Sequence, residues 1–301
     1  MELNRLRRRD VLKHISALTG AAVFTPRFLY ALTAGKRSAT DQISLGNTGI
    51  KMSRLGMGTG SRGGSIQEAL GRDGLCQLVK TAFDKGITYF DCAHNYRSFK
   101  WMGSALGQLP RKDLFVLSKV WGTPDDPMKN IEDQLRTLQT DYLDCIMCHC
   151  ATKSTWTSDR ERVMETMTKA KEQGKVRSVG VSCHSMEALE VASRADWVQV
   201  NLVRVNPQAR YTDRYKSTRR KTAASGIEPV LNEISEMKKN GHGVIGMKLV
   251  GNGDFKDPED REKAMRFVIS NPDIDAATVG FKNAAEIDES IRRMNNALKS
   301  A

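Results

Sequence analysis

The chain has 301 residues, of which 40% are hydrophobic and 27% charged, and its formal net charge is +12. This hydrophobic share is enough for a sizeable core, which excludes a wholly disordered chain. No apolar run approaches the roughly 18 residues that a membrane-spanning helix requires, so we expect no transmembrane span in the mature protein.

Residues 1–34 have the layout of an export signal. They hold six Lys and Arg against two acidic residues, followed by a weakly apolar run and by small residues. The sequence RRDVLK at residues 8–13 resembles a twin-arginine signal. We therefore assign 1–34 to a signal segment and 35–301 to the folded domain, and expect the twin-arginine machinery to export the protein to the periplasm. The alternative is a basic amphipathic first helix in a cytoplasmic protein.

From residue 54 onward, short apolar runs alternate with amphipathic segments of helical length. Such alternation implies parallel strands joined by helical crossovers. Eight units within about 250 residues predict an α/β protein with a closed (β/α)8 TIM barrel. The expected strands are 54–59, 88–91, 114–120, 143–149, 176–182, 197–201, 243–247 and 276–280. The expected helices are 74–84, 128–137, 160–173, 185–192, 228–239, 259–269 and 284–298.

Two segments stand apart from this pattern. Residues 42–52 predict a short β-hairpin, which we expect to cap the bottom of the barrel. Residues 210–221 hold six Lys and Arg and one acid with little apolar periodicity, so we expect a solvated loop at the top of the barrel. Nucleic-acid binding by this loop is an alternative. Because Tyr211 and Tyr215 are its only aromatic residues, we expect no nucleic-acid partner.

Three cysteines and a histidine between residues 145 and 150 raise the question of a metal knuckle. On a strand, successive side chains alternate between the two faces, so these neighbours cannot all reach one ion. We therefore expect no metal site. We also expect no compulsory disulfide framework, because the twin-arginine route carries proteins that folded in the reducing cytoplasm.

Four polar residues fall at or just after the ends of three consecutive expected strands, where a (β/α)8 barrel carries its chemistry. They are Asp91, Tyr96, Lys119 and His149. A lysine cation lowers the pKa of an adjacent tyrosine, and an aspartate allows that lysine to stay charged while buried. A histidine can donate a hydrogen bond to a substrate carbonyl. Each residue alone is more often structural, but their joint placement favours a catalytic set.

With these residues the chain resembles the aldo/keto reductase family, whose members use Asp, Tyr, Lys and His in a (β/α)8 barrel with a nicotinamide cofactor. The resemblance runs from about residue 43 to 298 and includes GITYFDCAHNY, VLSKVW and LRTLQTDYLDCIMCH. It implies that Tyr96 donates a proton and that Lys119 lowers the pKa of Tyr96. It also implies that Asp91 pairs with Lys119 and that His149 positions the carbonyl. The implied activity is reduction of an aldehyde or ketone to an alcohol, or the reverse, with hydride from the nicotinamide.

The resemblance also implies contacts with the nicotinamide half of the cofactor. Ser182, Cys183 and Gln199 correspond to positions that hold the carboxamide, although an asparagine is usual where Cys183 stands. Met247 stands where an aromatic residue commonly stacks on the nicotinamide, and without the resemblance it would be simple core filling. Lys248 is expected to face the pyrophosphate.

A second set of contacts is implied for the adenosine half. Gly280, Lys282 and Asn283 resemble the loop that binds the adenosine phosphate, with Lys282 at a 2′-phosphate. Their alternative role is capping of the following helix. Glu286 stands where the family often has an arginine, and its carboxylate would repel a phosphate, so we expect NADP(H) with NAD(H) as the alternative. The expected cofactor-binding residues at the end of the first strand are Gly58 and Thr59.

Substrate contacts are expected from the loops, with Trp121, Trp156 and residues 204–215 as candidates. We expect a small-molecule carbonyl substrate, and the basic loop would favour an anionic one. The alternative function is a cofactor-binding regulatory or scaffold protein on the same barrel, without turnover. The departures at Cys183, Met247 and Glu286 keep that alternative open.

Overall fold

The structure is a computed structural model that describes residues 37–215 and 226–300. The expected signal segment 1–34 lies outside the described residues. Residues 216–221, the second half of the expected basic loop, lie outside them as well.

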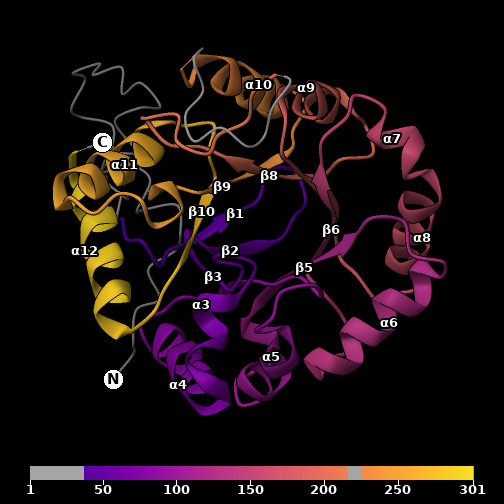
Figure 1. The fold of residues 1–301 in the computed structure, drawn as a ribbon, viewed down its shortest axis with the longest axis horizontal. Coiled ribbons are helices and arrows are strands. Elements are labelled where there is room, and N and C mark those ends of the chain that lie inside the picture. The colour runs from indigo at the N-terminus through magenta and orange to yellow at the C-terminus, as the bar shows by residue number, and fades with distance from the viewer. Residues whose placement is uncertain (1–36, 216–225, 301) are drawn as a thin grey trace, which may run out of the picture. The chain divides into compact units, whose positions relative to one another are not determined.

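Eight parallel strands form a closed barrel within the described residues (Figure 1). In chain order they are β3 Leu55–Gly58, β4 Tyr89–Asp91, β5 Phe115–Trp121, β6 Cys145–Ala151, β7 Val179–Cys183, β8 Val200–Arg204, β9 Gly243–Met247 and β10 Ala276–Gly280. Each strand pairs in parallel with the next, and β10 pairs with β3 to close the cylinder. This confirms the predicted (β/α)8 barrel.

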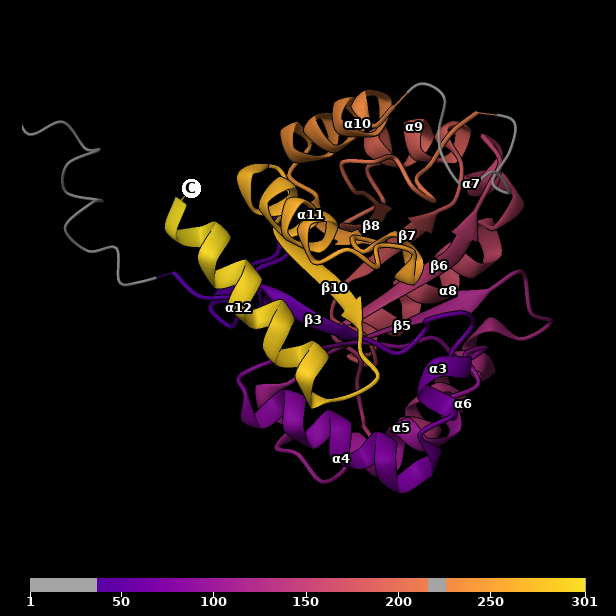
Figure 2. The same cartoon turned by 60° about the vertical axis from the view of Figure 1, so that its left-hand side comes forward.

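Helices surround the barrel and follow each strand (Figure 1). They are α3 Ser65–Glu68, α4 Gly71–Asp84, α5 Phe99–Leu106, α6 Pro127–Leu138, α7 Trp156–Asp159, α8 Glu161–Glu172, α9 Met186–Arg194, α10 Glu228–Lys239, α11 Pro258–Ser270 and α12 Ala284–Ser300, with 3-10 turns η1 Arg111–Asp113 and η2 Gly251–Gly253. In Figure 2, α11 and α12 lie side by side next to β10. None of the described helices combines the length and the apolar character needed to cross a bilayer.

The helix α6 illustrates how the sequence specifies these elements. Asp126 caps its N-terminus by accepting a hydrogen bond from the backbone N–H of Lys129 at 2.9 Å, and Pro127 occupies its first turn. Ile131, Leu135 and Leu138 follow at helical spacing and are buried. Because these side chains lie on one face, the helix packs that face against the barrel.

The hydrophobic core has two parts, separated by the wall of the barrel. One cluster lies between the strands and the surrounding helices. The other fills the barrel interior with side chains such as Tyr89, Phe115 and Met147. Cys145 belongs to the interior cluster and Cys148 to the outer one, so the two thiols point to opposite faces of β6. All six cysteines are free.

The predicted hairpin is present and closes the amino-terminal end of the barrel. Its strands β1 Gln42–Ser44 and β2 Lys51–Ser53 pair in antiparallel register. Leu45 and Met52 pack into the interior cluster, and the N–H of Asn47 donates to Gly241 O at 2.9 Å. Gly46 has a positive φ, and a Cβ there would meet the backbone before β9 at 2.3 Å, so only glycine fits.

The strand β8 begins three residues later than the sequence predicts, at Val200 instead of Trp197. The apolar run continues through Leu202 and Val203, and Val200 and Leu202 point into the barrel. By alternation, Arg204 also points inward, at the carboxyl end of the strand. The boundary shift therefore brings Arg204 to the barrel mouth.

The described part of the basic loop, residues 210–215, is not the solvated loop that the sequence predicts. Thr212, Asp213 and Arg214 are buried. Nε of Arg210 donates to Asp254 at 3.0 Å, and Asp213 accepts from Nε of Arg204 at 2.9 Å. Arg210 pairs with an acid outside the basic run, and Asp213, the acid within the run, is buried against Arg204. These contacts fold the segment onto the barrel.

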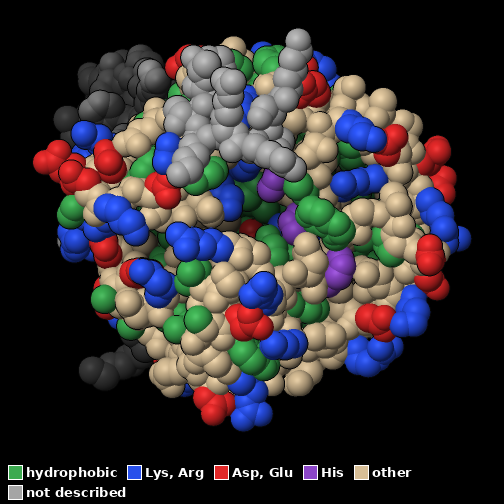
Figure 3. All heavy atoms as spheres, in the orientation of Figure 1, with side chains coloured by type: hydrophobic (Ala, Val, Ile, Leu, Met, Phe, Trp, Pro, Cys, Tyr) green, Lys and Arg blue, Asp and Glu red, His purple; other side chains and the backbone are tan. Residues whose placement is uncertain are grey.

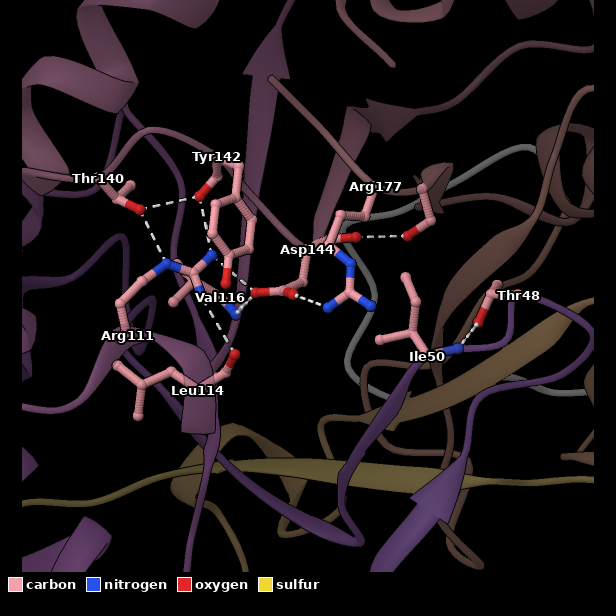
Figure 4. A network of polar contacts seen from close by, with 10 residues as sticks. Thr48, Ile50, Arg111, Leu114, Val116, Thr140, Tyr142, Asp144 and Arg177 are labelled. Carbon is pink, nitrogen blue, oxygen red and sulfur yellow. Dashed lines mark hydrogen bonds and ion pairs between the residues drawn. The ribbon is translucent and has the colours of Figure 1, made fainter. Parts of the chain in front are cut away.

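A buried carboxylate near the amino ends of the strands ties three segments together (Figure 4). Asp144 accepts hydrogen bonds from the backbone N–H of Val116 at 2.9 Å, from Nη2 of Arg111 at 2.8 Å and from Nη1 of Arg177 at 2.7 Å. Arg111 also donates to Leu114 O at 3.0 Å. The carboxylate thus links β5, the start of β6 and the segment before β7.

We expect Asp144→Ala to lower the free energy of unfolding by roughly 3 kcal/mol, because it leaves buried donors without their acceptor. Urea unfolding followed by circular dichroism measures this loss. The matched control is Asp133→Ala. Asp133 also pairs with two cations, but at an exposed site, and its loss is expected to leave the unfolding midpoint nearly unchanged. Equal losses in the two variants would contradict this account of the network.

Candidate active site

A cavity of about 550 Å³ opens at the carboxyl ends of the strands, between β3, β4, β9 and β10. Figure 3 shows a hollow at the centre of this face, with histidine and hydrophobic side chains at its edge. Seven of the residues predicted from the sequence line the cavity: Gly58, Asp91, Tyr96, Met247, Lys248, Gly280 and Lys282.

Asp91 and Tyr96 line this cavity, and Lys119 lies next to both of them. Asp91 ends β4 and pairs with Leu117 on the neighbouring strand β5. Lys119 lies two residues after Leu117, so its side chain points to the same face of the sheet as that of Asp91. Nζ of Lys119 donates to Oδ1 of Asp91 and, at 2.7 Å, to the carbonyl of Cys92. The same Nζ lies 5.1 Å from the centre of the Tyr96 ring. The structure therefore brings together the predicted acid, cation and phenol.

The position of Tyr96 depends on a glycine that the sequence reasoning missed. Tyr96 lies in a turn after β4, with its N–H donating to Ala93 O at 2.9 Å. A Cβ on Gly60 would lie 2.3 Å from Cζ of Tyr96. Gly60 thus allows the phenol ring to lie against the loop after β3. The run of alternating glycines from Gly56 to Gly60 was the available signal.

His149, on β6, lies beside Tyr96. The two rings meet edge to face at 5.6 Å, and Trp121 packs on the imidazole at 5.1 Å. Trp121 ends β5 and is 51% exposed, and its contact with a substrate stays a prediction. Trp156 is buried, and its Nε1 donates to Ala188 O at 3.2 Å. The expectation of a substrate contact from Trp156 is wrong, because its indole packs between the strands and α9.

The protonation of these groups follows from burial and from the Asp91–Lys119 pair. Burial lowers the pKa of Lys119, but the Asp91 carboxylate, with Tyr96 and Cys92, outweighs burial and holds this pKa above its usual value. Burial raises the pKa of Tyr96, and the Lys119 cation opposes that rise only in part. Burial, with Lys119 next, lowers the pKa of His149 to about 2. At neutral pH the site therefore holds a charged lysine, a protonated tyrosine and a neutral histidine.

Nδ1 of His149 is buried and has no hydrogen-bond partner in the described part of the chain. Buried polar atoms are normally paired, so this one marks a place where a ligand or water is expected to bind. The imidazole lies against the Tyr96 ring. The arrangement suits recognition of an oxygen atom placed between them.

Lys248 and Met247 follow β9 and line the cavity as expected. Nζ of Lys248 donates to Oδ1 of Asn252 at 2.9 Å. Burial, with the nearby Arg204 next, lowers the pKa of Lys248 to about 8. No carboxylate forms an ion pair with Lys248 among the described residues. A half-buried cation without an acidic partner favours an anionic ligand.

The loop after β10 has both the expected and the alternative features. Gly280 pairs with Gly58 in register, and both line the cavity. Oδ1 of Asn283 accepts from the N–H of Glu286 at 3.0 Å, which is the capping contact that was the alternative for this residue. Nζ of Lys282 lies 3.2 Å from the Glu286 carboxylate, so this lysine is already partly neutralised.

Five predicted cofactor contacts lie outside the lining of the cavity, and one of them is the capping residue Asn283. Thr59 is buried, and its hydroxyl donates to Asp91 O at 2.9 Å. Ser182 and Cys183 end β7 and are buried, with Oγ of Ser182 accepting from the N–H of Cys150 at 3.0 Å. Gln199 precedes β8 at the opposite end of the barrel.

The position of Gln199 does not fit the expected carboxamide contact. Its Oε1 accepts from Nζ of Lys171 at 2.7 Å and from the N–H of Val179 at 3.2 Å, both near the amino ends of the strands. Arg204 occupies the inward position at the carboxyl end of β8, whereas the sequence predicted that it lies in a loop. A correct strand boundary was the missing information.

The cavity lining carries more positive than negative charge. Its cations are Arg62, Lys248, Lys256, Arg261, Lys282 and Arg293, and its acids are Asp91, Glu286 and Glu289. The glycines Gly58 and Gly280 leave the backbone open at one wall. A cation-rich cavity that Tyr96 helps to line fits a dinucleotide with a charged phosphate backbone.

Comparison with known proteins agrees with the barrel fold. L-galactose dehydrogenase of Arabidopsis thaliana is 31% identical over 151 residues, which cover 46% of this chain and 47% of that protein. An aldo-keto reductase from Bacillus halodurans, solved in its holo form, overlaps 86% of this chain and 95% of its own, with a TM-score of 0.67 and 16% identity. An aldo-keto reductase from Klebsiella pneumoniae in complex with NADPH overlaps 86% and 89%, with a TM-score of 0.61 and 19% identity.

The chain spans about half the length of the curated relatives it matches. The solved structures, at these identities, show a shared fold. A family model described as the aldo/keto reductase family matches residues 54–301, from the first barrel strand to the end of the chain. The chain therefore belongs to the aldo/keto reductase family.

Proposed function

We propose that the protein is an NAD(P)H-dependent oxidoreductase that reduces an aldehyde or ketone to an alcohol, or catalyses the reverse reaction. The observation that carries this proposal is the proximity of Asp91, Tyr96, Lys119 and His149, of which Asp91 and Tyr96 line a cation-rich cavity. Membership of the aldo/keto reductase family supports it. A reduced nicotinamide dinucleotide, when bound, supplies the hydride.

Tyr96 supplies the proton in this proposal. Burial raises its pKa, so the phenol is protonated at neutral pH. The phenolate that remains after proton transfer is stabilised by the Lys119 cation, which Asp91 holds in place. His149 is neutral because burial lowers its pKa, so it orients a carbonyl through a hydrogen bond and does not act as the acid. Trp121 adds an apolar wall at the rim.

We infer that Lys248 and Lys282 hold the phosphates of the cofactor. Both line the cavity, and Lys248 has no ion-pair partner among the described residues. NADP(H) is the expected cofactor and NAD(H) the alternative, because Glu286 already neutralises part of the charge on Lys282. Met247 takes the place of an aromatic contact beside the nicotinamide.

Replacing the proton donor tests the proposed reaction directly. We expect Tyr96→Phe to lower kcat for carbonyl reduction by about 10²- to 10⁴-fold, because the ring remains but the transferable proton is lost. NADPH binding, followed by quenching of tryptophan fluorescence, is expected to stay within about twofold. Tyr142→Phe, at the other end of the barrel, is the matched control and is expected to keep full activity.

Two results would contradict this proposal. Equal turnover by Tyr96→Phe and the unsubstituted protein would remove Tyr96 from the mechanism. Tight cofactor binding without turnover over a broad panel of aldehydes and ketones would instead support the regulatory or scaffold alternative.

Cofactor affinity is expected to depend on pH through Lys248. Its pKa is lowered to about 8, so the amine is charged at pH 7 and mostly neutral at pH 9. Binding an anion favours the charged form, and the affinity for NADPH is therefore expected to fall about tenfold between these pH values. Lys248→Met is expected to bind more weakly at pH 7 and to lose this dependence. Isothermal titration of both proteins at pH 7 and 9 measures it, and parallel pH dependence would refute the assignment.

We propose that the twin-arginine machinery exports the protein. The support is the sequence RRDVLK at residues 8–13, within a segment of six Lys and Arg and two acids. Replacing Arg8 and Arg9 together with lysine keeps the charge but removes the guanidinium pair. We expect the variant to accumulate in the cytoplasm of a bacterial host that has the machinery, as cell fractionation would show. An unchanged distribution would contradict export by this route.

A further inference from the structure

A second tyrosine lies beneath the site, inside the barrel. Tyr89 is on β4, two residues before Asp91, and therefore points to the same face of the strand. Its side chain is fully buried among the apolar residues of the barrel interior. A phenolic hydroxyl in such surroundings is costly unless it has a hydrogen-bond partner.

That partner is the carboxylate of Asp91. The Tyr89 hydroxyl donates to Oδ2 of Asp91 at 3.3 Å, while Oδ1 accepts from Nζ of Lys119. Tyr89 is the one donor to Oδ2 among the described residues. Burial and the Asp91 charge hold the pKa of Tyr89 well above its usual value, so this phenol remains a donor at every working pH.

The packing around Tyr89 leaves its ring little freedom. Phe115 meets it edge to face at 5.2 Å. On the neighbouring strand β3, a Cβ on Gly56 would lie 2.0 Å from Cδ1 of Tyr89, so a glycine is required for the ring to fit. The hydroxyl is therefore held below Asp91 by the barrel itself.

We propose that Tyr89 is a positioning residue for the proton donor, acting through Asp91 on Lys119 and so on Tyr96. By binding Oδ2, it fixes the carboxylate with Oδ1 toward the lysine and disperses part of the negative charge of Asp91. More of the positive potential of Lys119 then reaches the phenol of Tyr96. This inference rests on the proposed function, since it concerns the residue that donates the proton.

Removing the hydroxyl has a definite direction. In Tyr89→Phe the ring stays in place, but Asp91 loses a hydrogen-bond donor. The full negative charge of Asp91 then acts on Lys119. The phenolate of Tyr96 is then less stabilised, and its titration moves to higher pH. The other titratable groups around Tyr96 are Cys92 after β4 and His149 on β6, and neither is altered by the substitution.

The first measurement is activity as a function of pH. We expect Tyr89→Phe to lower kcat about tenfold with KM for the carbonyl nearly unchanged, and to shift the basic limb of the kcat profile upward. The matched control is Ser118→Ala, which removes a buried hydroxyl next to Lys119 that donates to Gln134 at 2.5 Å and lies outside the Asp91 network. The control is expected to keep both the rate and the profile.

A double-mutant cycle separates action through Asp91 from a loss of packing. In an Asp91→Asn background, Tyr89→Phe is expected to cause no further change in kcat, whereas a packing defect would lower it again by a similar factor. Additive effects, or a Tyr89→Phe profile that matches the unsubstituted protein, would overturn the proposal.

A second readout does not require turnover. The ultraviolet absorbance of the Tyr96 phenolate is obtained as the difference from the corresponding Tyr96→Phe protein, titrated from neutral to alkaline pH. An upward shift in Tyr89→Phe supports the inference even when no carbonyl is reduced, in which case only the proposed function fails. Full activity of the parent with no shift in Tyr89→Phe refutes the inference and leaves the proposed function standing.

Discussion

The buried ion pair between Lys119 and Asp91 is the interaction on which the rest of the site depends. A lysine with 1% of its surface exposed keeps its charge only when a carboxylate compensates it. The parallel pairing of β4 with β5 brings the two side chains together, and the closed barrel holds both strands in that register. This fixed charge lies near both Tyr96 and His149 and acts on the pKa of each.

Two neutralised pairs and the amine of Lys248 contribute to the electrostatics of the barrel mouth. Asp91 compensates Lys119, and Asp213 compensates Arg204. Lys248 pairs with no carboxylate among the described residues, so the mouth retains positive charge and suits phosphate groups. The net charge of +12 has more than one source. Part of it lies in residues 1–34, and part in a segment whose described half is folded against the barrel.

The sequence was informative where function coincides with strand ends. Asp91, Lys119 and His149 each stand at or near the end of an apolar run. The alternation of strands and helices along the sequence was therefore enough to predict that they lie at the barrel mouth. Gln199 was misplaced because the apolar run of β8 extends past Asn201, which no local signal marks. Trp156 and the charged segment after β8 were misjudged because burial depends on contacts distant in sequence. Tyr89 and Gly60 act through packing, which appears only in three dimensions.

The central claim is that the Asp91–Lys119 pair sets the proton affinity of Tyr96. Titration of the Tyr96 phenol in Lys119→Met, compared with the unsubstituted protein, tests it most directly. The Lys119 cation opposes the rise that burial causes in the pKa of Tyr96, so its removal should move the titration to higher pH. An unchanged or lowered pKa in Lys119→Met would contradict the account.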